Sequence, residues 1–198
     1  ELCEELKEDR RTSHIPIILL TARADQKSKL EGLQHGADVY LTKPFDEEEL
    51  LVHINNLLLQ QNRLKKHYLH TIDFAPAAGL PELLPQESSF VQQVKSTITR
   101  YLSDSNFTVH QLSREVALSP SQLHRKLTAL TGYSASKMIR QIRLDKAKAL
   151  LQDLSRTISE VAYECGFNDP DYFSKVFKTE FGMIPTEYRK KTEGVKKD

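Results

Sequence analysis

The sequence is poor in the residues on which disulfide-rich and membrane-spanning proteins depend. Its 198 residues include two cysteines, Cys3 and Cys165, and no tryptophan. A single pair could close at most one bridge, which excludes a disulfide scaffold, and no apolar run is long enough to cross a bilayer. We therefore expect a cytoplasmic chain without membrane contact, in which Cys165 is a buried thiol.

Residues for catalysis are also scarce. We find no nucleophile–base pair, no metal-ligand cluster and no glycine-rich phosphate loop in the sequence. His67 and His70 have a spacing that suits a metal, but no further ligand lies nearby in the sequence, so we expect no metal site. The chain is therefore predicted not to be an enzyme.

The net charge of +1 points to no partner by itself, but the charge is unevenly distributed. Residues 1–75 contain 10 Lys and Arg against 13 Asp and Glu, a net charge of −3. The remainder contains 18 against 14, a net charge of +4. This asymmetry predicts an acidic module followed by a basic one.

The segment from Thr108 to Arg189 contains one helix-turn-helix pattern twice. Each copy begins with a capping-box pair, Thr108 with Gln111 and Thr157 with Glu160. Apolar positions recur at an offset of 49 residues before the turn (109 to 158) and of 50 after it (123 to 173). The equivalent pairs are Val109–Ile158, Leu112–Val161, Val116–Cys165, Leu123–Phe173, Leu127–Phe177 and Gly132–Gly182. The extra residue falls in the turn, where an insertion costs little, so the repeat indicates two similar structural units.

Helical periodicity predicts which side chains of the second helix in each copy face outward. The helices are expected at 119–131 and 170–181, with a helix from Ser88, a long helix over 134–152 and a last one from Pro185. Leu123, Leu127 and Leu130 mark one buried face, and Phe173, Val176, Phe177 and Phe181 mark the other. The side chains expected on or beside the outward faces are Ser121, Gln122, His124, Arg125, Lys126 and Thr128, then Asp171, Tyr172, Ser174, Lys175 and Lys178.

Residues 88–190 closely resemble the AraC-type DNA-binding domain. The resemblance rests on Arg143-Leu144, Ala147, Leu150-Leu151, Ile158, Val161-Ala162, Cys165-Gly166-Phe167, Tyr172-Phe173-Ser174, Phe177-Lys178, Phe181-Gly182, Pro185 and Tyr188-Arg189. It implies seven helices, of which one long helix joins two helix-turn-helix units. It also implies that both recognition helices enter successive major grooves of double-stranded DNA.

The outward side chains differ in what they are expected to read. Arg125 is the strongest candidate for a base contact, because a guanidinium can bind guanine O6 and N7 together. Gln122 and His124 either contact bases or are merely solvated, and Lys175 and Lys178 reach either bases or phosphates. Asp171 either accepts from a cytosine amine or stabilises its helix N-terminus, and Tyr172 either reads or packs.

Residues 1–67 have the pattern of a parallel α/β module. An apolar run at 15–20, a helix from Asp25 to His35, a strand at 39–42 and a helix capped by Asp46 alternate along the chain. The strings Ile17-Ile18-Leu19-Leu20-Thr21-Ala22 and Gly36 through Phe45 resemble the second half of a two-component receiver domain. The resemblance implies that Thr21 and Lys43 bind an aspartyl phosphate and that the rotamer of Tyr40 reports it.

The first half of such a receiver would lie before residue 1. Its acidic Mg²⁺-binding pair and phosphoacceptor aspartate have no substitute here, because Asp25, Asp38 and Asp46 lie on the wrong side of Thr21 and Lys43. We therefore expect no cofactor, since Mg²⁺ and the aspartyl phosphate belong to an intact receiver. The chain lacks an initiator Met and is expected to be a fragment. Its exposed sheet edge should either pair with another copy or be poorly ordered.

A helix that extends beyond the receiver pattern leads into a linker. Leu50, Ile54, Leu57, Gln61, Leu64 and Tyr68 follow a 4-3-4-3-4 spacing. This seam is either a rigid dimer helix or a core-facing stripe that fades into a polar tail. Residues 68–87 are expected to be the linker, and residues 191–198 a basic tail.

The sequence thus predicts a mainly α-helical chain, in which part of an α/β receiver precedes an all-α double helix-turn-helix domain. Its predicted function is sequence-specific transcription regulation as the output part of a two-component protein, with promoter DNA as partner. A homodimer is expected through the receiver part or its last helix. The parent is either a stand-alone response regulator or a hybrid sensor kinase. The alternative is a phosphorelay protein whose helical domain docks protein partners.

Overall fold

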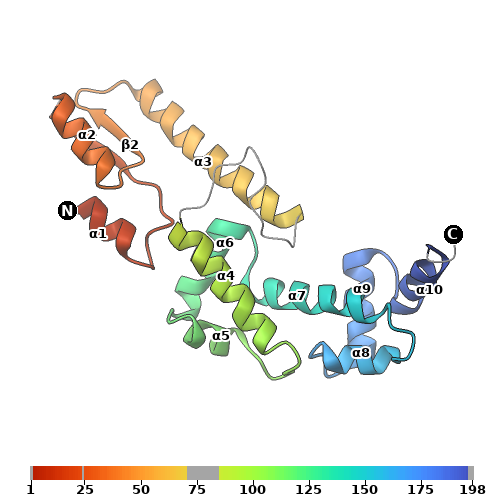
Figure 1. Cartoon of the computed structure of the whole chain (residues 1–198). Coiled ribbons are helices and arrows are strands. Elements are labelled where there is room, and N and C mark those ends of the chain that lie inside the picture. Colours follow the sequence, from red (N-terminus) through yellow and green to blue (C-terminus); the bar gives the residue numbers. More distant parts are fainter. Residues whose placement is uncertain (1, 24, 71–84, 196–198) are drawn as a thin grey trace. The chain divides into compact units, whose positions relative to one another are not determined.

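The computed structural model describes residues 2–23, 25–70 and 85–195, which form two compact units (Figure 1). The first combines residues 1–91 with residues 121–133, and the second combines residues 92–120 with residues 134–198. The described elements are mostly helices, together with two parallel strands, which confirms the predicted fold class. The domain boundaries at 67, 87 and 190 stay predictions. The expected linker segment 71–84 and the end of the basic tail, 196–198, lie outside the described residues.

The first unit contains a small parallel sheet with helices. Its elements are α1 (Leu2–Glu8), β1 (Ile18–Thr21), α2 (Gln26–Gln34), β2 (Val39–Thr42), α3 (Glu47–His70), the beginning of α4 (Pro85–Arg100) and nearly all of α6 (Pro120–Thr131). The strands pair in register from Ile18–Val39 to Thr21–Thr42, and α2 packs beside β2 (Figure 1). Tyr40 and Leu41 are the buried residues of β2.

The first strand begins three residues later than the apolar run predicted. The run starts at Ile15, but the backbone N–H of Ile15 donates to Thr12 O (2.8 Å) in a turn, and Pro16 has no N–H to donate. Ile17 O already accepts from the N–H groups of Asp38 and Val39 (2.9 and 3.2 Å). The register is therefore set at Ile17, and the regular ladder begins at Ile18.

Helix α3 begins after Asp46, whose Oδ1 accepts from the N–H of Glu48 (2.7 Å). Seam residues Leu50, Ile54, Leu57 and Gln61 are half-buried, and the side chains of Leu64 and Tyr68 lie outside what the structure describes, as do those of His67 and His70. Leu51, Val52, Leu58 and Leu59 are exposed. None of the helices described has both the length and the apolar character needed to cross a membrane.

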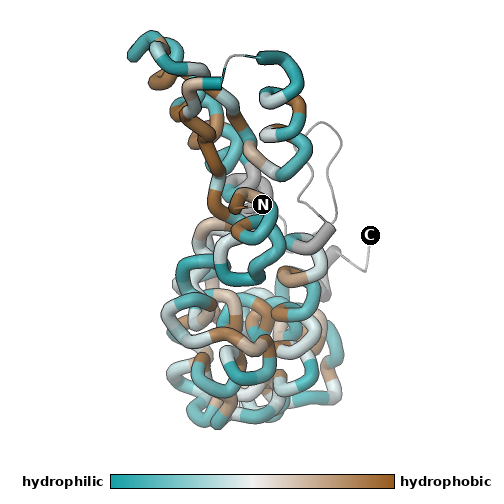
Figure 2. Tube along the Cα trace, turned by 90° about the vertical axis from the view of Figure 1, so that its left-hand side faces the viewer, coloured by the Kyte–Doolittle hydropathy of each residue, from teal (hydrophilic) through white to brown (hydrophobic). Residues whose placement is uncertain are grey.

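The second unit is helical. It contains the remainder of α4, then α5 (Val109–Glu115), α7 (Ala135–Leu150), α8 (Ile158–Glu164), α9 (Pro170–Phe181) and α10 (Pro185–Val195). Hydrophobic and hydrophilic segments alternate along the helices, as amphipathic helices require (Figure 2). Its fully buried side chains include Val94, Ile98, Leu112, Val116, Leu144, Leu151, Val161, Cys165, Phe173 and Phe177. The predicted burial of Cys165 is confirmed, and this burial raises the pKa of its thiol to about 12.

Candidate nucleic-acid interface

The second helix-turn-helix copy is built from α8, a tight turn and α9. The predicted capping box is confirmed: the N–H of Thr157 donates to Glu160 Oε2 (2.6 Å), and the N–H of Glu160 donates to Thr157 Oγ1 (3.2 Å). Gly166 then turns the chain with a φ of +76°. A Cβ at this position would lie 2.3 Å from Leu102 O, so the turn requires glycine.

An aromatic cluster fixes the orientation of α9. The Phe177 ring lies 5.6 Å from Phe173, 4.6 Å from Phe181 and 5.6 Å from Tyr188, each in an edge-on arrangement that aromatic rings favour. The opposite face of α9 is open to solvent. Its exposed residues include Asp171, Tyr172, Lys175 and Lys178. The half-buried Ser174 donates its hydroxyl proton to Pro170 O (2.9 Å), so that proton is engaged within its own helix.

The first copy has the same local design with a different core. The N–H of Thr108 donates to Gln111 Oε1 (2.7 Å), and the N–H of Gln111 donates to Thr108 Oγ1 (3.3 Å), which confirms the capping box of α5. In α6 the predicted buried face is confirmed, with Leu123, Leu127 and Leu130 in the interior. Ser121, His124 and Arg125 are exposed, and Gln122 and Thr128 are half-buried.

Lys126 does not lie where the outward projection placed it. It is only 1% exposed, and its ammonium donates to Arg10 O (2.6 Å) and Ser13 Oγ (2.9 Å) and lies 4.8 Å from the centre of the Phe90 ring. Burial lowers the pKa of Lys126, while the carboxylate of Glu87 acts in the opposite direction. In this conformation the side chain is engaged away from solvent, and a DNA contact of Lys126 stays a prediction.

The receiver-like residues gather at the carboxyl ends of the two strands. Thr21 pairs with Thr42 across the sheet, and the N–H of Lys43 donates to Thr21 O (2.6 Å). The Tyr40 hydroxyl donates to Arg23 O (2.8 Å), and its ring is buried. Thr21 and Lys43 are thus neighbours in the backbone, whereas Tyr40 is held inward.

Magnesium would need a cluster of oxygen ligands beside these strand ends. Within residues 2–23, 25–70 and 85–195, no group of three or more His, Cys, Asp or Glu side chains is placed to hold a metal ion. These described residues therefore provide no cluster of oxygen ligands that would fit the ion.

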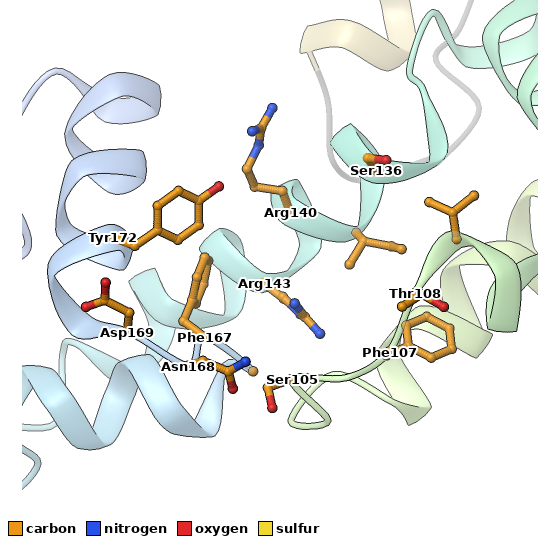
Figure 3. Close-up of a pocket in the computed structure, with 13 residues that line it drawn as sticks. Ser105, Phe107, Thr108, Ser136, Arg140, Arg143, Phe167, Asn168, Asp169 and Tyr172 are labelled. Carbon is orange, nitrogen blue, oxygen red and sulfur yellow. The ribbon is translucent and has the colours of Figure 1, made fainter.

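A cavity of about 560 Å³ opens beside the N-terminal end of α9 (Figure 3). It lies between the Ser105–Val109 segment, one face of α7 and the turn that leads into α9. Its floor contains the buried rings of Phe107 and Phe167, together with Ile139. The polar groups along it are Ser105, Thr108, Ser136, Arg140, Arg143, Asn168, Asp169 and Tyr172.

Two arginines of α7 line this cavity and behave differently. Arg143 donates from Nη2 to Asp104 O (2.6 Å), and burial lowers its pKa. The guanidinium of Arg143 turns toward Ser105 and Phe107, while the Arg140 side chain extends the opposite way, upward in the view (Figure 3). Arg140 is exposed, with no hydrogen-bond or ion-pair partner among the described residues. The sequence analysis missed Arg140. Its i, i+4 spacing from Ser136 and i, i+3 spacing to Arg143 would have placed all three on one helix face.

Two family patterns match the chain. The pattern described as "Helix-turn-helix domain" matches residues 112–191, and that described as "Response regulator receiver domain" matches residues 1–55. The matched ranges include both second helices, α6 and α9, and both strands of the sheet.

The chain is similar to longer signalling and regulatory proteins. It is 34% identical over 189 residues to Histidine kinase P4 of Formosa agariphila, covering 96% of this chain and 14% of the kinase. It is 38% identical over 135 residues to the HTH-type transcriptional activator RhaR of Yersinia pseudotuberculosis, covering 68% of this chain and 44% of RhaR. The chain therefore spans less than half the length of each of these relatives.

Two solved structures share the helical part of the fold. A DNA-binding transcriptional dual regulator from Escherichia coli K-12 aligns with a TM-score of 0.50 and 27% identity, over 60% of this chain and 99% of that one. The C-terminal domain of AraT, a response regulator from Geobacillus stearothermophilus, aligns with a TM-score of 0.50 and 29% identity, over 56% of this chain and 88% of that one. The chain carries an AraC-type helix-turn-helix domain preceded by part of a response-regulator receiver domain.

Proposed function

We propose that this chain is the output part of a two-component signalling protein and binds promoter DNA sequence-specifically to regulate transcription. The observation that carries the proposal is the exposure of Arg125 on α6 and of Lys175 and Lys178 on α9. Both helices follow a capped helix and a turn, and both bury their opposite faces. This is the arrangement in which a second helix presents side chains to a major groove. Two similar proteins, the transcriptional activator RhaR and the DNA-binding transcriptional dual regulator of Escherichia coli, support it.

Some of the exposed side chains would contact bases and others would contact phosphates. Arg125 would read a guanine through its two parallel N–H donors, with His124 and Gln122 beside it. Lys175 and Lys178 would contribute cation contacts, of which at least one falls on a phosphate. Asp171 is exposed in the first turn of α9, where a carboxylate also stabilises the helix N-terminus. Ser121, Tyr172 and Ser174 also belong to the proposed set.

Control would come from the receiver part of the intact protein. Phosphorylation of an aspartate outside this chain would shift receiver pairing and bring two DNA-binding domains onto adjacent half-sites. The exposed apolar residues Leu51, Val52, Leu58 and Leu59 on α3 support a homodimer through this helix. In this proposal the chain itself responds to the phosphate and does not accept it.

Fluorescence anisotropy of the whole chain on a pool of duplexes of about 30 base pairs, or about three helical turns, tests the proposal. We expect tight binding to a few duplexes that persists when salt is raised. Arg125→Ala should cost about 1–3 kcal/mol on the selected duplex and relax specificity at one base pair. Arg114→Ala, at an exposed arginine of α5, is the matched control.

Two results would contradict the proposal. Equal, salt-sensitive binding to every duplex would leave a basic helical domain without sequence recognition. The same small loss in both arginine variants would remove Arg125 from the reading set, and the protein-docking alternative would then explain the domain better.

A further inference from the structure

From the cavity beside α9 we infer a phosphate-contact site whose cation is Arg140, with Ser136 and Tyr172 as neighbouring hydroxyl donors. The inference rests on the proposed DNA-binding function and adds a positioning contact on α7, a helix outside both helix-turn-helix motifs. Arg140 and Ser136 are four residues apart, so both side chains lie on the α7 face that lines the cavity. Tyr172 comes from the first turn of α9, and its hydroxyl points toward the side of the cavity where Arg140 lies (Figure 3).

Of the two arginines that line the cavity, only Arg140 is exposed. Arg143 donates from Nη2 to Asp104 O, and its buried Nε, which has no hydrogen-bond partner among the described residues, lies where an added Cβ at Gly166 would approach to 2.9 Å. Arg140 is exposed and has no partner in the part of the chain that the structure describes. All N–H donors of an exposed guanidinium without a protein partner are available to a ligand, and their fork geometry matches a phosphate.

The position of Arg140 favours a backbone phosphate over a base edge. In a recognition helix that enters a major groove, side chains on its own outer face reach the bases. Arg140 belongs to the neighbouring helix and flanks the N-terminal end of α9, so it would face the strand that forms the groove wall. Tyr172 belongs both to the exposed face of α9, where 51% of its surface is accessible, and to the lining of the cavity beside Arg140.

One nearby carboxylate limits the strength of the site. Asp169 also lines the cavity, and its Oδ1 accepts from the N–H of Asp171 (2.8 Å) as the cap of α9. This hydrogen bond engages one of its oxygens, but its charge still opposes an anion. We therefore infer a single phosphate contact that orients α9, without a separate affinity for small anions.

The test measures the affinity of the whole chain for its selected duplex and for a scrambled duplex over a range of salt. Arg140→Gln should weaken both by the same factor, several-fold, and lower the slope of log affinity against log salt by about 0.9, the value for one phosphate contact. Arg140→Lys keeps the charge and should keep most of the slope. Lys146→Gln removes an exposed charge from the same helix and should change neither measurement appreciably.

Each other outcome overturns the inference in a recognisable way. Unchanged affinity and slope in Arg140→Gln, with a wild-type chain that binds, rejects Arg140 and leaves the proposed function intact. A loss confined to one base pair makes Arg140 a base reader. A wild-type chain that binds no duplex rejects the proposed function and this inference together. Because Arg140 is exposed, its variants should keep the wild-type melting temperature, which separates a lost contact from a lost fold.

Discussion

The two helix-turn-helix copies share their backbone design and differ in how they are packed. Both begin with a confirmed capping box and both bury one face of the second helix. The buried face of α6 is aliphatic, with Leu123 and Leu127, whereas the equivalent positions of α9 are Phe173 and Phe177 in an aromatic cluster. The helix starts and the apolar spacing therefore specify the motif, while the chemistry of the core can vary.

The turns of the two copies both need a residue with a left-handed backbone conformation, and they use different residue types for it. Ala117 has a φ of +54° in the first turn, and Gly166 has a φ of +76° at the equivalent place in the second. Alanine is tolerated in the first turn because Ala117 is exposed. The second turn lies against Leu102 O and has no room for a Cβ. The same left-handed step is thus mildly strained in one copy and relaxed in the other.

The largest loss of stability should come from truncating the central buried side chain of either second helix. Phe177→Ala deletes a ring that contacts three others and should destabilise the second unit by about 3–5 kcal/mol, at the upper end of the range because the aromatic pairs are also lost. Leu127→Ala removes the equivalent aliphatic side chain and should cost about 2–5 kcal/mol. Urea denaturation followed by circular dichroism measures both.

A substitution at an exposed position of the same helix serves as the control for Phe177→Ala. Tyr172→Ala, at an exposed aromatic position of α9, serves as the control and should change stability little. If Phe177→Ala cost no more than Tyr172→Ala, the aromatic cluster would not be what holds α9 in place.

Exchanging the turn residues should give smaller effects of opposite sign. Gly166→Ala should cost more than the roughly 1–2 kcal/mol of a left-handed alanine, because its Cβ would also meet Leu102 O. Ala117→Gly should gain about 0.5–1 kcal/mol, since relief of left-handed strain exceeds the added entropy of the unfolded chain.

Gly182 provides the control for the turn comparison. Its φ is +75°, but a Cβ there would meet no atom within 4 Å, so Gly182→Ala isolates the conformational cost without a clash. Thermal melting of the three variants orders them. Equal losses in Gly166→Ala and Gly182→Ala would show that the contact with Leu102 O is unimportant.

Local patterns predicted the elements well, and long-range packing explains most of what they missed. The capping boxes, the burial of Cys165 and the β2 strand at Val39–Thr42 follow from short-range signals, and all are confirmed. Helix α4 begins at Pro85 instead of Ser88, because proline suits the first turn of a helix, where no N–H donor is needed. The cavity beside α9 joins segments far apart in the chain, so no local pattern could indicate it.

Lys126 shows where the helical projection of α6 was wrong, because this side chain is buried. It lies three residues after Leu123 and four before Leu130, which places it on the buried side of α6. At the repeat offset of 50 its equivalent is Val176, an apolar residue. Our projection of the helix nevertheless placed it beside the outward face. Its long stem fills an apolar position, while its ammonium reaches Arg10 O and Ser13 Oγ, which a pattern within the repeat could not reveal.

This comparison gives the prediction with the smallest expected effect. Lys126→Met keeps the apolar stem and removes the buried charge, as Val176 already does in the second copy. The loss of two hydrogen bonds and the relief of ammonium desolvation should nearly cancel, so stability should change by less than about 1 kcal/mol. Hydrogen exchange of residues 10–14 should nevertheless accelerate, because that segment loses its anchor on α6. Lys175→Met, on the exposed face of α9, should leave this exchange unchanged. A loss above about 2 kcal/mol in Lys126→Met would mean that the ammonium contacts outweigh the apolar pattern shared by the two copies.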